Sequence, residues 1–329
     1  MAGSDELCKA RKQKFLIIIE RDVGLFSLIH QVINSLYLAQ QHQLIPICYF
    51  TTACCYYVPE GYHNNHTVWE YYFEPLDPMF DEQTLLQLNN VQRSLFMANH
   101  IVTHEYKPRI SGNSAKISVP FLSDPTPAMR RSINRMIDQK IHLKARIRDK
   151  VDCFWQQSLD ADFTIGVHIR GTDAIDHSLR QQNVNIEEYI SLIHRVIRIK
   201  NEAGVKKIKV FIASDDQKSI NDIREACSIE CISYPAIRKN ITSSMNSGRG
   251  PTGEIMPAFL TENALKAAQS GEDALVECYL LARCDLFIHN ISSLARTVLL
   301  LNPSLESVNL RAKDYPRIRQ LLAEAKARA

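Results

Sequence analysis

Residues 166–173 (Gly-Val-His-Ile-Arg-Gly-Thr-Asp) place several side chains that can bind a ligand or transfer a proton close together in the sequence. The apolar run that leads into them predicts a fully buried strand over 163–169. Because side chains alternate along a strand, His168 and Arg170 are expected on one face at its carboxyl end. An arginine in that place can bind a phosphate through two parallel donors, or it can pair with a carboxylate of its own domain.

Two acidic residues follow the next predicted strand. Asp215 and Asp216 lie directly after a strand expected at 207–214 and before a helix expected at 217–227. Their carboxylates can contact a ribose, a base or a neighbouring arginine. Asp at this position can also cap the free N–H groups of the helix, so both functions remain open.

A serine pair lies at another junction between a strand and a helix. Ser292 and Ser293 follow Asn290, between a strand expected at 285–290 and a helix expected at 293–301. Hydroxyls and free N–H groups at a helix start can form a phosphate cradle. Serine is equally suited to act there as an ordinary N-cap.

Glu277 is a carboxylate on the apolar face of a helix expected at 271–284. A carboxylate in such surroundings needs a partner. The Watson–Crick edge of guanine offers paired N–H donors that a carboxylate can accept. The alternative partner is a salt-bridging arginine, for which Arg283 and Arg296 are the candidates.

The elements that must position these residues alternate between strand and helix in both halves of the chain. Near the N-terminus, a strand at 14–20 is followed by Gly24, an amphipathic helix and a strand at 44–50, which together predict a βαβ unit. One helix is expected over 127–157, and the second half continues with further strands and helices, including a helix at 186–200. This pattern predicts an α/β fold with two doubly wound, Rossmann-type parallel sheets, whose ligands bind outside the carboxyl ends of the strands.

Two segments have no regular pattern. Residues 51–126 contain an aromatic cluster around Trp69 and Tyr72, which is interpreted as packed core in preference to a sugar-stacking platform. Residues 234–262 form an expected loop that contains a literal GxGxxG at 248–253. No strand precedes this glycine repeat and a proline interrupts it, so it does not predict a dinucleotide site.

Length and composition set broad limits. A chain of 329 residues suggests about two domains. The net charge of +3 is too balanced for a general nucleic-acid binder. The polar N-terminus and the absence of a long apolar run predict no signal peptide, no membrane span and a cytoplasmic location. Nine cysteines, an odd number, indicate reduced thiols, and Cys227 and Cys231 lack the second Cys/His pair that a zinc site requires.

Three segments in order resemble a known family. GVHIRGTD, VFIASDD and GEDALVECYLLARCDLFIHNISS look like the motifs of the fucosyltransferases that include the rhizobial nodulation enzyme and the core α-1,6-fucosyltransferase. The resemblance covers residues 163–300 and extends more weakly to the helix after Gly24. It implies a two-domain GT-B-like architecture, a GDP-fucose donor, a glycan or other hydroxyl acceptor, inversion at the anomeric carbon, and neither metal nor other cofactor.

The resemblance also implies roles by position. Arg170 would hold the β-phosphate and stabilise the departing GDP, and Gly24 would let the backbone approach the donor unless it only forms a tight turn. The domains would be an acceptor side at 1–155 and a donor side at 156–329. The remaining donor-site positions are His168 and Glu277 at the nucleoside, Asp215 and Asp216 in the donor pocket, and Ser292 and Ser293 at phosphate.

The sequence departs from the family pattern directly after Arg170. Gly171 replaces a second basic residue, Ala174 replaces a lysine, and Ser178 aligns near the carboxylate that acts as base in the core enzyme. Asp173 is therefore the expected catalytic base, with Asp176 and His177 as alternatives. A transferase using another nucleotide-sugar, or a non-catalytic GDP-binding protein, remains open.

Overall fold

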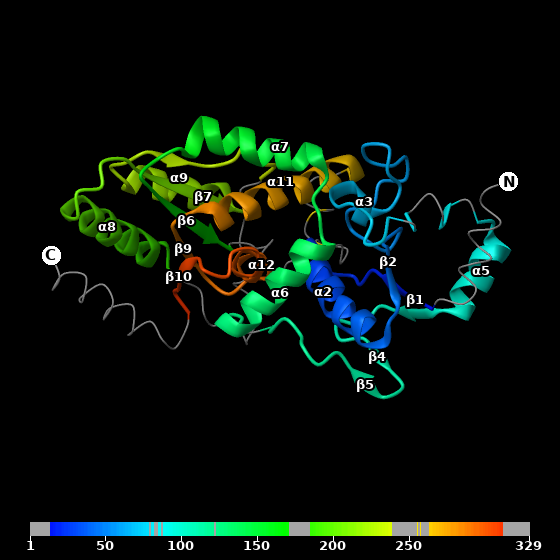
Figure 1. Ribbon diagram of the computed structural model, residues 1–329. Coiled ribbons are helices and arrows are strands. Elements are labelled where there is room, and N and C mark those ends of the chain that lie inside the picture. The colour runs from blue at the N-terminus through cyan, green and yellow to red at the C-terminus, as the bar shows by residue number, and fades with distance from the viewer. Residues whose placement is uncertain are drawn as a thin grey trace. The chain divides into compact units, whose positions relative to one another are not determined.

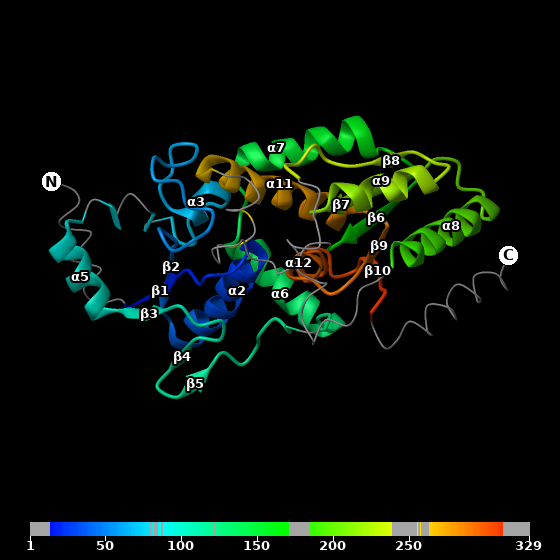
Figure 2. The same ribbon diagram turned by 180° about the vertical axis from the view of Figure 1, so that it is seen from behind.

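The computed structural model describes residues 14–311 apart from a few short gaps and two longer ones. Contacts between Cα atoms divide the chain into two compact units, whose elements are labelled in Figures 1 and 2. The N-terminal unit comprises 1–120, 135–145 and 261–268, and the C-terminal unit 121–134, 146–260 and 269–329. The expected boundary between 155 and 156, with an acceptor side and a donor side, stays a prediction. The residues outside the description are 1–13, 79, 82–84, 87, 122, 171–184, 239–254, 256, 258–262 and 312–329.

The C-terminal unit is built on a five-stranded sheet in the order β10-β9-β6-β7-β8, in which every pairing is parallel. The predicted strand after residue 162 is its central strand, and the strands expected near 207–214 and 285–290 are its two neighbours. The two outer strands were not predicted. The strands are β6 (Phe163–Ile169), β7 (Ile208–Ser214), β8 (Cys231–Ile232), β9 (Leu286–His289) and β10 (Glu306–Asn309).

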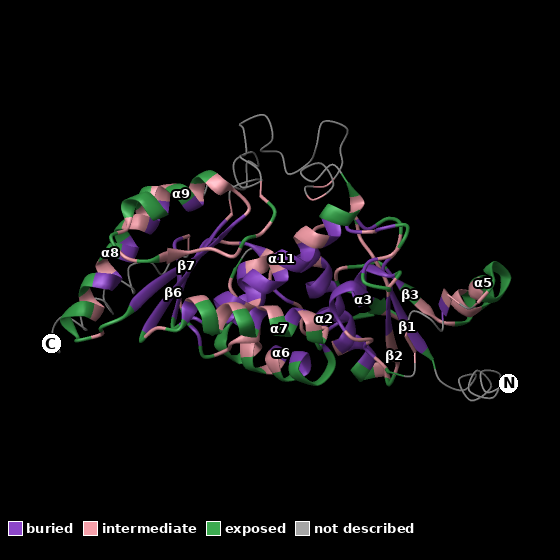
Figure 3. Ribbon diagram, turned by 90° about the horizontal axis from the view of Figure 1, so that it is seen from above, coloured by how far each residue is buried: buried purple, intermediate pink, exposed green. Residues whose placement is uncertain are grey.

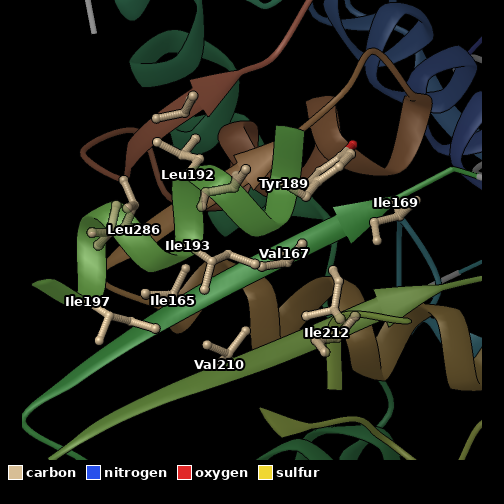
Figure 4. Close-up of a cluster of buried hydrophobic side chains, with 14 of the residues drawn as sticks. Ile165, Val167, Ile169, Tyr189, Leu192, Ile193, Ile197, Val210, Ile212 and Leu286 are labelled. Carbon is tan, nitrogen blue, oxygen red and sulfur yellow. The ribbon is translucent and has the colours of Figure 1, made fainter. Parts of the chain in front are cut away.

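Helices α8 (Ile186–Glu202) and α9 (Gln217–Ala226) cover one face of this sheet. Figure 3 shows α8 beside β6, and Figure 4 shows the apolar side chains of α8 against those of β6 and β7. Each fully buried aliphatic side chain contributes roughly 1.5–3 kcal/mol. The buried residues of this cluster include Ile165, Val167, Ile169, Tyr189, Leu192, Ile193, Ile197, Val210, Ile212 and Leu286.

Helix α11 (Ala264–Arg283) packs on the opposite face, where Gly166 allows a close approach. A Cβ added at Gly166 would lie 2.9 Å from Cys284 Sγ and 3.1 Å from Leu281 Cδ2. Gly166 is therefore needed for packing and not for its backbone conformation. Helix α12 (Ser293–Leu301) follows β9, as expected.

The N-terminal unit contains a three-stranded parallel sheet in the order β2-β1-β3. Strands β1 (Phe15–Ile19) and β2 (Ile45–Tyr49), with helix α2 (Leu25–His42) between them, confirm the predicted βαβ unit. The third strand, β3 (Ile101–Thr103), was not predicted because only a short, polar-flanked run marks it.

The irregular stretch between β2 and residue 127 contains short elements around an aromatic core. Trp69 and Phe73 stack with ring centroids 4.3 Å apart, and Tyr71 and Tyr72 are fully buried. The packed-core interpretation of this cluster is therefore confirmed. The elements are α3 (Val68–Tyr72), α5 (Asn90–Asn99) and the hairpin of β4 (Arg109–Ile110) and β5 (Asn113–Ser114).

The prediction of a single helix over 127–157 is wrong. The structure has two helices and a π-helical turn in its place, α6 (Pro127–Lys140), α7 (Ala145–Phe154) and Trp155–Leu159. Between the helices, His142 O accepts a hydrogen bond from Glu74 N and Lys144 N donates one to Tyr72 O. Residues 142–144 therefore pair with residues 72–74 in place of forming the helical hydrogen bonds that their local propensity favours.

Candidate functional site

Polar side chains converge where β6, β7 and β9 end. The parallel register pairs His168 with Ala213 on one side and with His289 on the other, and Ile169 with Ser214. The carboxyl ends of the three central strands therefore meet at one edge of the sheet, the place where ligands of such sheets bind. Arg170 follows β6 directly, as predicted from the sequence, and is partly buried.

His168 is a buried imidazole whose ring nitrogens are poorly satisfied by the described residues. It is 6% exposed, and neither ring nitrogen makes a hydrogen bond of good geometry to a described residue, although the Ala213 backbone on β7 lies close enough to act on its ionisation. Burial, and then the charges of His289 and Arg170, lower its pKa to about 3. The ring is therefore neutral at physiological pH and offers one donor and one acceptor. Leaving such groups unpaired is costly, which indicates a place for a ligand.

The same edge contains two further buried polar atoms without a hydrogen-bond partner in the described chain. These are His289 Nε2 and Asn290 Oδ1. His289 Nδ1 lies 3.1 Å from Asn290 O, and its Nε2 lies 3.8 Å from Asp124 Oδ2. Burial lowers the pKa of His289. The sequence interpretation noted Asn290 but missed His289, although its place opposite His168 follows from the strand register.

Glu277 points from α11 into an ion pair with Arg238, and both side chains are buried. Glu277 therefore forms a salt bridge, as the alternative prediction expected, but its partner is Arg238 and neither Arg283 nor Arg296. Arg283 pairs with Asp152, and Arg296 donates to Phe121 O and Ser293 Oγ. Burial raises the pKa of Glu277 to about 8, against the attraction of Arg238 and with the repulsion of acidic neighbours.

Arg238 connects Glu277 to the end of β7. Its guanidinium also donates to Ser214 O at 2.8 Å, Tyr234 O at 2.8 Å and Ala236 O at 3.1 Å. These bonds hold the segment after β8 against the strand edge. No sequence signal identified Arg238, because it follows a two-residue strand that the pattern did not predict.

The two aspartates after β7 have different surroundings. Asp216 caps α9, because its carboxylate accepts from Lys218 N, Ser219 N and Ser219 Oγ. The capping alternative is confirmed for this residue. Asp215 lies close enough to Glu277 for its charge to raise the pKa of that carboxyl. The edge therefore brings Asp215, Glu277 and the end of β7 together.

The two serines after β9 have different partners, and only Ser292 caps the helix. Ser292 is the N-cap of α12, and its Oγ accepts from Ala295 N at 2.9 Å. Ser293 Oγ accepts from Arg296 at 3.0 Å. The N-terminus of α12 thus lies at the sheet edge, close in sequence to Asn290, where its remaining N–H groups can face an anion.

Two predicted positions fall elsewhere. Asp173, the expected base, and its alternatives Asp176 and His177 lie outside the described residues. Gly24 precedes α2 in the N-terminal unit, with φ −66° and ψ 159°, a conformation open to any residue. An added Cβ would meet only Tyr56 Oη at 4.0 Å, so neither the conformation nor the described surroundings of this position require glycine.

Fold and site together define an α/β protein of the GT-B class with a polar ligand edge on its C-terminal sheet. The chain belongs to the NodZ family, because the family model for nodulation protein Z matches residues 128–328. A comparison with curated protein sequences gives no match. The resemblance to the nodulation fucosyltransferase family is confirmed.

Solved structures of the family have the same fold. A NodZ α-1,6-fucosyltransferase soaked with GDP-fucose is 16% identical, with a TM-score of 0.51, covering 92% of this chain and 97% of that one. The fucosyltransferase NodZ from Bradyrhizobium is 15% identical, with a TM-score of 0.51 and coverages of 91% and 96%. The predicted GT-B class is confirmed.

Two kinds of feature are absent from the described chain, a cluster of metal-ligating side chains and a helix able to cross a membrane. No group of three or more His, Cys, Asp or Glu side chains there is arranged to hold a metal ion. None of the described helices combines the length and the apolar composition needed to cross a bilayer.

Proposed function

We propose that the protein transfers fucose from GDP-fucose to a hydroxyl acceptor, with inversion and without a metal ion. The observation that carries the proposal is the sheet edge itself: Arg170 follows the central strand, two residues after His168, a buried imidazole whose ring nitrogens make no hydrogen bond of good geometry to a described residue. Membership of the NodZ family supports it, because a NodZ structure of the same fold was soaked with GDP-fucose.

The nucleoside end of the donor is assigned to His168 and Glu277. A neutral imidazole supplies one donor and one acceptor to a base or ribose. Glu277 Oε1 is held by Arg238, and the carboxylate can accept the paired N–H groups of guanine through its second oxygen. Arg238 fixes the orientation of that carboxylate, so the pair serves recognition better than a freely rotating side chain would.

The chemical step requires stabilisation of charge on the leaving β-phosphate. An acceptor hydroxyl attacks the anomeric carbon from the face opposite GDP, and the bond to the phosphate oxygen breaks. Arg170 and the N–H groups at the start of α12 stabilise the oxygen that becomes negative. Loss of one such contact typically lowers kcat by about 10²–10³-fold.

A general base completes the proposal. Asp173, or else Asp176 or His177, takes the proton of the acceptor hydroxyl, and such catalysis typically contributes about 10²–10⁴-fold. Asp173 is preferred because it lies close in sequence to Arg170.

We also propose that the protein acts in the cytoplasm.

Product analysis tests the activity. Wild type is incubated with GDP-fucose and a panel of glycan acceptors in EDTA, and NMR assigns the anomeric configuration of the product. We expect transfer with inversion in wild type, a loss of about 10²-fold or more in Arg170→Ala and a partial loss in Arg170→Lys. Activity of Arg170→Ala within a few fold of wild type would exclude the assigned role of Arg170.

A second candidate is a GDP-binding protein without transferase activity. Gly171 favours it, because the family pattern has a second basic residue at that position. The same product analysis separates the two: GDP binding without transfer or donor hydrolysis, over the full acceptor panel, supports this second function.

A further inference from the structure

A pair of cysteines lies at the edge of the C-terminal sheet, where α9 passes into β8. Cys227 ends α9, residues 228–230 turn the chain, and Cys231 begins β8. Both thiols are free and partly exposed, and both pack against the apolar cluster beneath α8 and α9. The proposed transfer reaction uses neither residue.

The two thiols lie close enough to act on each other's ionisation. His194 of α8 is exposed, its Nε2 lies 3.0 Å from Ala226 O, the residue before Cys227, and its ring acts on the ionisation of the Cys227 thiol. The charged group that acts on Cys231 is Arg224 of α9. Three elements thus place two sulfurs and an imidazole in one partly exposed cluster.

The surroundings make the two sulfurs chemically unequal. The hydrogen bond from Cys231, and then His194, lower the pKa of Cys227 to about 7. The hydrogen bond to Cys227, and then burial, raise the pKa of Cys231. Near neutral pH, Cys227 is therefore partly a thiolate, the nucleophilic form, next to a protonated thiol.

The geometry points to Cys227 and Cys231 as a peroxide-sensitive modification site that closes to a reversible disulfide. The Cys227 thiolate attacks a peroxide oxygen, the O–O bond breaks, and a sulfenic acid and hydroxide form. The Cys231 thiol then attacks that sulfur, the S–S bond forms, and the sulfenic oxygen leaves as water with the Cys231 proton. The hydroxide of the first step is neutralised by the proton that Cys227 released when it ionised. Two thiols lose two electrons, and the peroxide gains them.

The other cysteines of the described chain lack this arrangement. Cys48, Cys278 and Cys284 are buried, and burial raises the pKa of each thiol. Cys55 contacts Cys54, but that contact and burial raise its pKa. Cys153 is exposed, so it serves as a control for simple accessibility.

Peptide mass spectrometry tests the site in the full-length protein. Reduced protein is treated with hydrogen peroxide, free thiols are alkylated, and the protein is digested with trypsin. Cys227 and Cys231 fall together in peptide 225–238, whereas Cys153 is alone in peptide 151–170. We expect 225–238 without alkyl groups and lighter by two hydrogens, restored to a doubly alkylated peptide by dithiothreitol, before Cys153 reacts appreciably.

Two variants test the order of the steps. Cys231→Ser should accumulate a dimedone-trapped sulfenic acid at Cys227, whereas Cys227→Ser should leave Cys231 unlabelled. His194→Ala, at an exposed position, should slow the reaction severalfold at neutral pH. A doubly alkylated 225–238 peptide in wild type, under peroxide that oxidises Cys153, would overturn the proposal, and so would dimedone labelling of Cys231 in preference to Cys227.

Discussion

At the scale of single residues, the site is marked by polar groups that the folded chain leaves unpaired. A buried donor or acceptor without a partner costs about 1–3 kcal/mol. His168, His289 and Asn290 all carry such atoms at one sheet edge, and within the described chain none of these atoms has a hydrogen-bond partner, although His289 Nε2 lies 3.8 Å from Asp124 Oδ2. Stability alone would favour apolar residues at these positions, which supports the proposed ligand site.

His168→Leu is expected to separate stability from binding. Removing the unpaired imidazole should leave the free energy of unfolding within about 1 kcal/mol of wild type, or raise it, since no described hydrogen bond is lost. GDP affinity should fall at least about tenfold, the loss expected from one or more hydrogen bonds. Urea denaturation and calorimetry measure the two quantities.

Thr164→Val is the matched control on the same face of β6. Thr164 is buried, and its hydroxyl has a partner, because it donates to Leu159 O at 3.4 Å. This variant should lose stability and keep GDP affinity. A His168→Leu protein that is clearly destabilised but binds GDP normally would make His168 a structural residue.

Glu277 gives a pH dependence with a definite sign. Its raised pKa of about 8 means that the carboxyl is mostly protonated at pH 7 in the free protein. Accepting N–H groups from guanine requires the ionised form, so GDP affinity should rise with pH and level off above the pKa. A group with a pKa of about 8 gives an increase of about eightfold between pH 7.0 and 8.5.

Glu277→Gln is the control, because this variant lacks the titrating Glu277 carboxyl while the phosphates of GDP titrate as before. The increase with pH, measured by calorimetry, should be present in wild type and absent in the variant. An equal pH dependence in both proteins would assign it to other groups and leave Glu277 as a structural partner of Arg238.

At the scale of elements, the contact between β6 and α11 depends on Gly166. Gly166→Ala should lower the free energy of unfolding by about 1–3 kcal/mol, the usual cost of overpacking a core. The cause is the clash of the new Cβ with Cys284 Sγ, which has little room to move. Chemical denaturation of the purified variant gives the value directly.

A double variant checks the cause. Cys284→Ala removes the sulfur that the new Cβ would meet, so Gly166→Ala should cost less in the Cys284→Ala background than in wild type. Equal costs in the two backgrounds would show that Cys284 is not the residue that limits this contact.

Elements with a strong apolar period were predictable from the sequence, and those defined by tertiary pairing were not. β6, β7, α8 and α9 each carry a long apolar pattern and were placed within a residue or two. β8 has two residues, and the break between α6 and α7 exists because residues 142–144 pair with 72–74. No local signal contains that information.

The same distinction applies to the site. His168 and Arg170 were predictable because they end a clear strand, and the cap at Asp216 was predictable from its place before α9. The partner of Glu277 was not, because Arg238 reaches it from a segment distant in sequence and without a pattern of its own. The roles of Asp173 and Gly24 stay predictions.

At the scale of the whole molecule, the chain combines the fold of the NodZ family with departures from the expected motif directly after Arg170. The NodZ family model matches residues 128–328, which contain the polar sheet edge of the C-terminal unit. Gly171 and Ala174 stand where the resemblance to the family implies charged residues. Nucleotide recognition is therefore the part of the proposal that the described residues support best, and transfer is the part that depends on the departures.

Calorimetric titration with GDP, UDP and ADP, in the presence and absence of EDTA, tests the central claim most directly. Wild type, Arg170→Ala and the Thr164→Val control would be compared. We predict GDP binding at least about tenfold tighter than UDP or ADP binding, unchanged by EDTA, retained in the control and lost in Arg170→Ala. Absence of GDP binding by folded wild type, or equal binding of all three nucleotides, would contradict the assignment of the sheet edge as a GDP-sugar site.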